Sequence, residues 1–173
     1  MVDVILRGGT VVDGTGQPRY QADVAIVGDR ISAIGPALPK ATGAREIDVS
    51  GKTVAPGFID VHTHDDRALL ASPEMAAKTS QGVTTVITGN CGISLAPLTL
   101  DESPPPPLDL IGGVDDYAYP RFGDYLDALD RSPPALNAAC LVGHPHPRLW
   151  GTFPRILGHY CRLASSVVVE IRR

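Results

Sequence analysis

Residues 54–64, Val-Ala-Pro-Gly-Phe-Ile-Asp-Val-His-Thr-His, form the stretch that decides the fold. The first eight of these residues have the apolar composition of a strand, and two histidines follow, separated by one residue. Because side chains alternate between the faces of a strand, His62 and His64 are expected on one side and Thr63 on the other. Two such imidazoles can hold one metal ion at a strand end, which in a parallel barrel is the active-site face. The alternative is a polar strand end with two solvated histidines.

The sequence after the histidine pair predicts a βαβ unit. Residues 68–81 have a helix-compatible composition, with Ser72-Pro73-Glu74 as a start signal and Gly82 at the position of a C-terminal cap. A β-branched run at residues 83–88 then predicts a strand, followed by Gly89-Asn90-Cys91-Gly92. Strand, helix and strand with short connections imply a parallel sheet and a right-handed crossover.

The next part of the chain repeats this alternation after a long interruption. Residues 97–121 are rich in proline and glycine and predict an irregular excursion, more typical of a lid than of a linker. Residues 122–129 carry apolar side chains at helical spacing, so a helix is expected there. Residues 137–142 form a third apolar run, which ends in Gly143-His144.

Residues 1–54 predict a small, separate β domain. Gly28-Asp29 lies between two alternating runs and predicts a hairpin. Ser50-Gly51-Lys52 is expected to join a second pair of strands in the same way. A sheet of this size buries little by itself, so we expect it to pack against something else. The expected strands are residues 3–6, 10–12, 23–27, 30–34, 46–49 and 53–54.

Three predicted strands therefore end in metal-binding groups: the histidine pair, then Cys91, then His144. If the strands are parallel neighbours, these groups meet at one mouth. Imidazoles with a thiolate favour zinc over magnesium or calcium, which prefer oxygen ligands. Taken singly, Cys91 would be a small buried residue and His144 a hydrogen-bonded strand end. Cys140 lies in the middle of the third strand and is expected in the core.

Three carboxylates surround the histidine pair in the sequence. Asp60 precedes it by two residues and is expected on the same face, where burial would require a partner. Asp65 and Asp66 follow it. They either hydrogen-bond to the histidines and orient them, or cap the start of the loop, and the sequence leaves both possibilities open.

The composition narrows the class of protein. The chain has 173 residues, of which 43% are hydrophobic and 20% charged, as expected for a globular protein without a membrane span. Its net charge of −4 argues against a nucleic-acid surface. Three cysteines at wide spacing give no disulfide framework. Met1 leads directly into strand-like sequence rather than a signal peptide, so a cytoplasmic location is expected.

Residues 54–64 resemble the signature of the amidohydrolase superfamily, whose members combine a (β/α)₈ barrel with a small β-sandwich. Asp66, residues 80–86 and residues 89–97 (Gly-Asn-Cys-Gly-Ile-Ser-Leu-Ala-Pro) are similar to the N-acyl-D-amino-acid deacylase branch, and Val142-Gly143-His144 looks like its third barrel strand. The resemblance covers about residues 1–144. It implies a β-sandwich portion at residues 1–54 and the first βα units of an incomplete barrel at residues 55–144.

The resemblance also implies the chemistry. His62, His64 and Cys91 would be zinc ligands, with Cys91 as the bridging thiolate, and His144 would line the mouth and contact substrate. The implied reaction is zinc-dependent hydrolysis of a small-molecule N-acyl-D-amino acid to a carboxylate and a D-amino acid. The general base would be an aspartate of a later strand, so no catalytic residue is assigned here. Cyclic-amide relatives use a carboxylated lysine where this branch uses cysteine.

Residues 145–173 depart from this pattern. They carry a net charge of +4, against −8 for residues 1–144, and their only acidic residue is Glu170. A complete barrel needs roughly 250 residues. We therefore expect an anomalous tail, produced by a shifted reading frame or a gene remnant, with a divergent C-terminal end as the alternative. We expect a truncated deacylase that is inactive by itself; the alternatives are a different amidohydrolase, one that acts on cyclic amides, and a non-catalytic fragment. An incomplete barrel is also expected to self-associate.

Overall fold

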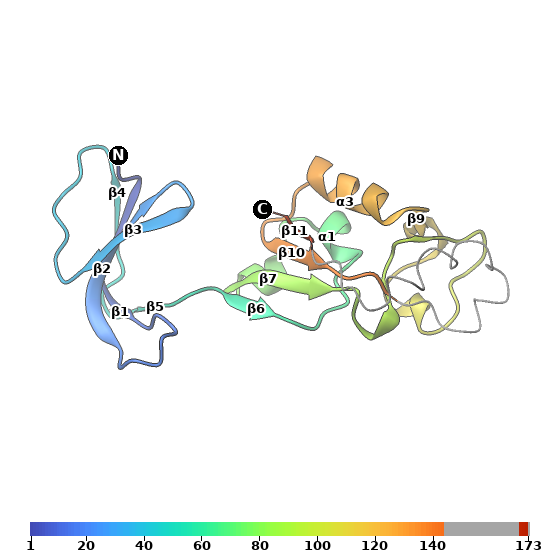
Figure 1. Cartoon of the computed structure of the whole chain (residues 1–173), viewed down its shortest axis with the longest axis horizontal. Coiled ribbons are helices and arrows are strands. Elements are labelled where there is room, and N and C mark those ends of the chain that lie inside the picture. The colour runs from blue at the N-terminus through green and yellow to red at the C-terminus, as the bar shows by residue number, and fades with distance from the viewer. Residues whose placement is uncertain (144–169, 173) are drawn as a thin grey trace. The chain divides into compact units, whose positions relative to one another are not determined.

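The computed structural model describes residues 1–143 and the backbone of residues 170–172, and it divides the chain into two compact units, Met1–Pro56 and Gly57–Arg173 (Figure 1). His144 and most of the predicted tail at residues 145–173 lie outside the described residues. The predicted boundary after residue 54 falls two residues before the division between the units. Each unit has its own sheet.

The first unit is a five-stranded sheet in the order β3-β2-β1-β4, with β5 also paired to β1. The hairpin expected around Gly28-Asp29 is confirmed, because β2 and β3 pair antiparallel on either side of it. Apolar side chains of β1 and β2, among them Val11 and Val24, form a small core of this unit. The strands are β1 (Val4–Val11), β2 (Tyr20–Val27), β3 (Arg30–Gly35), β4 (Arg45–Asp48) and β5 (Thr53–Val54).

Two expectations for this unit are wrong, and Gly8 explains both. Residues 3–6 and 10–12 belong to one strand, β1, whose register shifts between Leu6 and Gly9. Gly8 has φ +67°, and a Cβ there would lie 2.7 Å from the Ser50 hydroxyl oxygen. The turn at Ser50, which joins β4 to β5, can therefore lie directly against the Gly8 backbone. β4 pairs parallel with one part of β1 and β5 with the other, rather than with each other.

A buried carboxylate holds the bulge of β1 in place. Asp23 is 7% exposed and accepts hydrogen bonds from the Gly8 N–H at 2.8 Å and the Leu38 N–H at 3.0 Å. The Arg7 guanidinium donates to the same carboxylate at 2.7 Å and to Glu46 at 2.6 Å. The hydrogen bonds from Gly8, Arg7 and Leu38 hold the pKa of Asp23 below its ordinary value.

This arrangement predicts acid sensitivity of the first unit. The folded-state pKa of Asp23 is lowered, so its carboxylate stabilises the fold above the unfolded-state pKa near 3.8, and this contribution disappears as the pH falls through the folded-state value. We expect Asp23→Asn to lower the melting temperature at pH 7 and to flatten its decline below pH 4. Circular dichroism melts of both proteins across this range provide the test. If the melting temperatures of the two proteins fell equally with pH, Asp23 would not be the source of this acid sensitivity.

The second unit is built on a four-stranded sheet in the order β11-β10-β7-β6. β6 (Phe58–Asp60), β7 (Val83–Thr88) and β10 (Asn137–Cys140) are parallel neighbours, which confirms the predicted βαβ unit. The expected third strand, residues 137–142, is two residues shorter in the structure. β11 (Glu170–Arg172) runs antiparallel to β10, whereas a further βα unit would add a parallel strand.

The predicted helix at residues 68–81 is two short helices, α1 (Ala68–Ala71) and α2 (Ala76–Thr79). The break lies at Ser72-Pro73-Glu74, where the sequence predicts a helix start. Met75 adopts a left-handed φ of 46° and is 5% exposed, so its side chain turns into the core instead of continuing a helix. Gly82, at φ +82°, ends the segment as expected.

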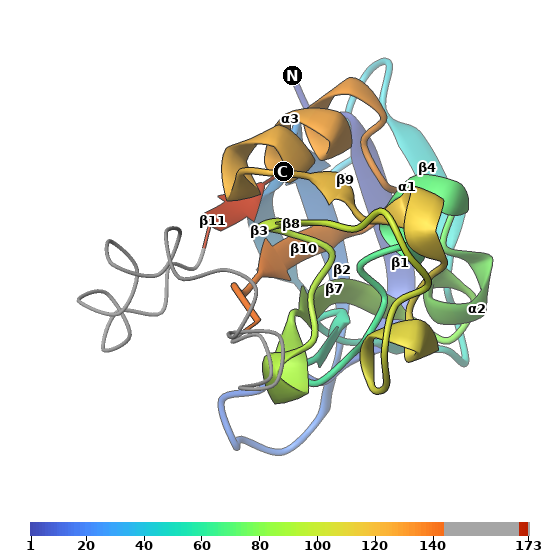
Figure 2. The same cartoon turned by 90° about the vertical axis from the view of Figure 1, so that its right-hand side faces the viewer.

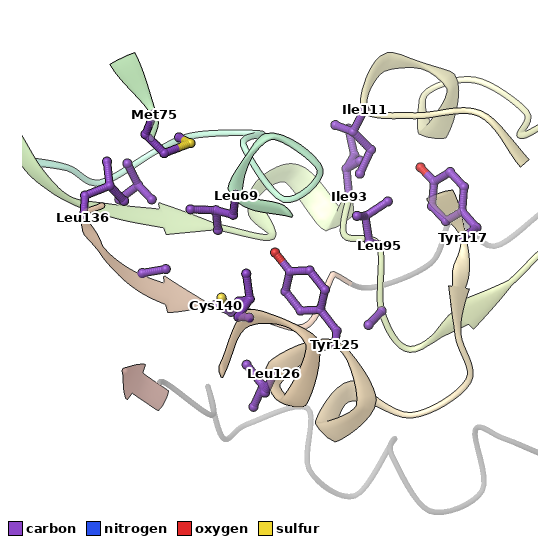
Figure 3. Packing of buried hydrophobic residues seen from close by; sticks show 14 of the residues in the cluster. Leu69, Met75, Ile93, Leu95, Ile111, Tyr117, Tyr125, Leu126, Leu136 and Cys140 are labelled. Atoms are coloured by element: carbon purple, nitrogen blue, oxygen red, sulfur yellow. The ribbon is translucent and has the colours of Figure 1, made fainter. Parts of the chain in front are cut away.

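Helix α3 (Phe122–Arg131) closes the core of the second unit (Figures 2 and 3). The helical spacing of its apolar residues is confirmed, since Tyr125, Leu126 and Leu129 are all buried. In Figure 3 the ring of Tyr125 points toward Leu69 of α1 and lies beside the buried Cys140 of β10. The core therefore lies between the helices and one face of the β7–β10 sheet.

The excursion at residues 97–121 is irregular, as expected, but it is not a detached lid. Leu108, Ile111 and Tyr117 are at most 6% exposed and belong to the same core. The Tyr117 hydroxyl donates to the Leu108 carbonyl oxygen at 2.6 Å. Its elements are β8 (Leu98–Thr99), η2 (Leu108–Leu110), η3 (Val114–Asp116) and β9 (Ala118–Tyr119), with β8 and β9 paired antiparallel.

Across the described part of the chain, the helices are all too short or too polar to cross a lipid bilayer.

Candidate metal centre

The histidine pair lies just beyond strand β6, which covers Phe58–Asp60 rather than the expected residues 54–61, because Val54 belongs to β5 and pairs with β1. Thr63 is 4% exposed, and its N–H and hydroxyl both donate to the Ile87 carbonyl oxygen, at 3.0 and 3.3 Å. His62 and His64 are exposed on either side of it, and their ring centroids are 5.7 Å apart. The expected alternation therefore persists past the strand because Thr63 continues the pairing with β7.

Cys91 lies in a tight turn at the end of β7. The 3₁₀ turn Asn90–Gly92 follows Gly89, and Cys91 has a left-handed φ of 56°. A Cβ on Gly89 would lie 2.1 Å from the Leu141 carbonyl oxygen, and one on Gly143 would lie 2.8 Å from the Gly92 backbone. The turn is thus packed directly on the segment that follows β10.

The two loops bring three potential ligands together. His62 Nε2 is 3.1 Å from Cys91 Sγ, and one ligand atom from each of His62, His64 and Cys91 lies within 4.8 Å of the others. Zinc bonds of about 2.0–2.3 Å at tetrahedral angles separate neighbouring ligand atoms by roughly 3.3–3.7 Å. All three residues are exposed, which leaves room for further ligands. The 3.1 Å between His62 Nε2 and Cys91 Sγ is close to this range, and two nitrogens with one sulfur form a donor set that suits zinc.

Lys78 is a neighbour of the histidine loop that no residue pattern predicted. Its ammonium group donates to Asp60 Oδ2 at 2.6 Å and forms an ion pair with Asp65 Oδ2 at 3.1 Å. This bond from Lys78 lowers the pKa of Asp60, whose other oxygen accepts the His62 N–H at 3.4 Å. Lys78 is the only cationic residue between Arg67 and Arg121, a signal that could have pointed to it.

Asp66 forms its hydrogen bonds with the loops around the site and not with the imidazoles. It is 1% exposed, and its carboxylate accepts the Gly89 N–H at 3.3 Å, at the base of the Cys91 turn. The Tyr125 hydroxyl of helix α3 donates to the Asp66 carbonyl oxygen at 2.8 Å. Burial raises the pKa of the Asp66 carboxyl to about 6. Of the two possibilities left open for Asp66, these contacts favour the capping one.

The structure does not place the remaining predicted site residue. His144 lies one residue beyond the described part of the chain, directly after the buried Gly143. The Gly143 N–H donates to the Ser94 hydroxyl at 3.0 Å, which ties the end of the third strand to the loop after Cys91. A contact of His144 with substrate stays a prediction.

Comparison with known proteins gives concordant results. A model of the amidohydrolase family matches residues 45–149. D-aminoacylase from Alcaligenes xylosoxydans xylosoxydans is 57% identical over 142 residues, which are 82% of this chain and 29% of that protein. A D-aminoacylase structure described for its binuclear metal centre matches with a TM-score of 0.79 and 58% identity, over 83% of this chain and 30% of that chain.

A second solved structure carries an inhibitor. It is N-acyl-D-glutamate deacylase from Bordetella bronchiseptica, complexed with zinc and a phosphonate that mimics the tetrahedral intermediate. It matches with a TM-score of 0.76 and 44% identity, over 86% of this chain and 31% of that chain. The chain therefore spans about three tenths of the length of these relatives.

Proposed function

Because this chain belongs to the amidohydrolase family, we propose that it supplies the His62, His64 and Cys91 ligands of a zinc centre that hydrolyses N-acyl-D-amino acids. The single observation that carries the proposal is the convergence of one thiol and two imidazoles at the ends of neighbouring parallel strands. The relatives with 57% and 44% identity are both deacylases of this kind by name, and the second was solved with zinc.

The chemistry follows from the donor set. Zinc bound there supplies Lewis-acid activation of water and of the scissile carbonyl group. The residues of this chain hold and orient it: His62 and His64 through ring nitrogens, Cys91 through its thiolate sulfur. Asp60 and Lys78 fix the backbone at His62. We place His144 at the same mouth as a substrate contact and assign no general base among the described residues.

The Cys91 thiolate also distinguishes this proposal from the alternative, an amidohydrolase of cyclic amides. An amidohydrolase of cyclic amides would use a carboxylated lysine as metal bridge. In this chain the Cys91 Sγ lies 3.1 Å from His62 Nε2, where its thiolate can take that role. The linear-amide substrate class is accordingly the one we propose.

A chimeric enzyme tests the substrate class. Residues 1–143 of this chain would replace the matching segment of the Alcaligenes D-aminoacylase, which is 57% identical. With zinc added, we expect the chimera to release D-methionine from N-acetyl-D-methionine and to leave N-acetyl-L-methionine and hydantoin intact. The same chimera with Cys91→Ala should lose at least about 100-fold in kcat/KM, since metal affinity depends on that ligand.

Two outcomes of this assay would contradict the proposal. A folded, zinc-loaded chimera that hydrolyses hydantoin but not the N-acyl-D-amino acid would favour the cyclic-amide alternative. Full activity of the Cys91→Ala chimera would show that the thiol takes no part in the centre. Reassembly of the unmodified Alcaligenes enzyme by the same procedure serves as the control.

A cytoplasmic location and self-association complete the proposal. Phe58, Ile59 and Val61 lie in or beside β6 and are between 60% and 65% exposed. A contiguous exposed apolar stretch of this kind favours association with another surface.

A further inference from the structure

We propose that Asn90 is the positioning residue of the metal centre: its side-chain amide fastens the Cys91 turn to the backbone between His62 and His64. Asn90 touches neither substrate nor metal in this role. The inference rests on the proposed zinc centre, and it goes beyond it by assigning the device that sets the distance between the thiol and the histidines.

The amide of Asn90 bridges the two loops of the site. Its Nδ2 donates to the Ile87 carbonyl oxygen at 2.7 Å and to the Thr63 carbonyl oxygen at 3.4 Å. The Ile87 oxygen also accepts the N–H and the hydroxyl of Thr63. One half-buried side chain thus connects the turn that carries the thiol with the residue that separates the two imidazoles.

The conformation of Cys91 explains why such a connection is needed. A left-handed φ such as 56° is unfavourable for a non-glycine residue and persists only where its surroundings impose it. Gly92 is held from one side by the close approach of Gly143. Asn90 holds the other side of Cys91. Without this hold, the turn can relax to a conformation that moves Sγ away from His62 Nε2, now 3.1 Å distant.

The chemistry of the two acceptors specifies an amide. Both partners of Asn90 are carbonyl oxygens, which accept hydrogen bonds only, so the side chain must donate twice from one group. Asparagine does this with its NH₂. Leucine has the same branched side-chain skeleton and cannot donate, and therefore Asn90→Leu removes the hydrogen bonds while it keeps the branched shape.

Cobalt titration of the full 173-residue chain tests the inference, because a cobalt–thiolate bond absorbs in the near ultraviolet and reports the Cys91 contact directly. We expect Asn90→Ala and Asn90→Leu to weaken cobalt binding by about 10–100-fold, as is typical when a partner of a ligand is lost, and to diminish the thiolate band at saturation. The diminished band is the readout that a general loss of stability would not produce in a protein that remains folded by circular dichroism.

Asn137→Ala is the matched control. Asn137 is the other asparagine of the chain, and its Nδ2 donates to the Thr84 carbonyl oxygen at 3.2 Å. Thr84 lies near the start of β7, whereas the Cys91 turn follows the end of this strand. Its replacement should leave both cobalt affinity and the thiolate band unchanged. Unchanged affinity and band in both Asn90 variants would overturn this inference alone. Absence of cobalt binding by the unaltered chain would overturn the proposed metal centre and this inference with it.

Discussion

Cys91→Ala is expected to weaken zinc binding by the 173-residue chain about 100-fold. The apparent binding free energy of a structural zinc site is about 10–16 kcal/mol, so one of four ligands contributes on the order of 3 kcal/mol, and each 1.4 kcal/mol is tenfold in affinity. Cys91 Sγ is exposed and lies 3.1 Å from His62 Nε2. Isothermal titration calorimetry with a competing chelator measures the change.

Cys140→Ala is the control variant, because it removes a thiol that lies outside the proposed metal centre. Cys140 is 1% exposed and lies in the core with Tyr125, so we expect this variant to unfold more easily but to bind zinc as the unaltered chain does. Equal affinities of the Cys91→Ala variant and the unaltered chain would exclude Cys91 as a ligand.

Gly89→Ala is expected to destabilise the second unit by about 3 kcal/mol or more. Two costs add at this position. Its φ of +77° costs an alanine about 1–2 kcal/mol, and the new Cβ would lie 2.1 Å from the Leu141 carbonyl oxygen, where the neighbour is backbone and cannot turn aside. Hydrogen exchange of the β7 and β10 amides, read by mass spectrometry, measures the free energy of opening.

Gly14→Ala is the control for the conformational part of this cost. Gly14 has nearly the same φ, +79°, but a Cβ there would meet nothing within 4 Å. We expect a loss of about 1–2 kcal/mol in the first unit and no change in β7. If Gly89→Ala were no more damaging than Gly14→Ala, the close approach of the Cys91 turn to the third strand would be wrong.

The elements that position the site were largely predictable from residue patterns. The β-branched run of β7 occupies residues 83–88 as expected, and the apolar spacing of α3 identified its buried face. The parallel order of β6, β7 and β10 followed from strand–helix–strand alternation. These features are local or periodic, so a single sequence contains them. The proximity of His62, His64 and Cys91 follows from the same topology.

Other features depend on contacts between distant residues and left no local pattern. Ser72-Pro73-Glu74 has the composition of a helix start, yet Met75 turns into the core there because burial outweighs helix propensity. β4 and β5 pair with different parts of β1 because Gly8, at the bulge of β1, allows the Ser50 turn between them to lie close. No residue near Ser50 in the sequence indicates this pairing. The pairing of Lys78 with Asp60 likewise depends on where helix α2 lies.

X-ray absorption at the zinc edge of the zinc-loaded 173-residue chain can decide whether Cys91 binds the metal, because it identifies the atoms bound to zinc. We expect one sulfur at about 2.3 Å together with nitrogen or oxygen atoms at about 2.0–2.1 Å, and loss of the sulfur contribution in Cys91→Ala. A zinc environment of nitrogen and oxygen alone in the unaltered chain, or a sulfur contribution that survives Cys91→Ala, would exclude Cys91 as the sulfur ligand.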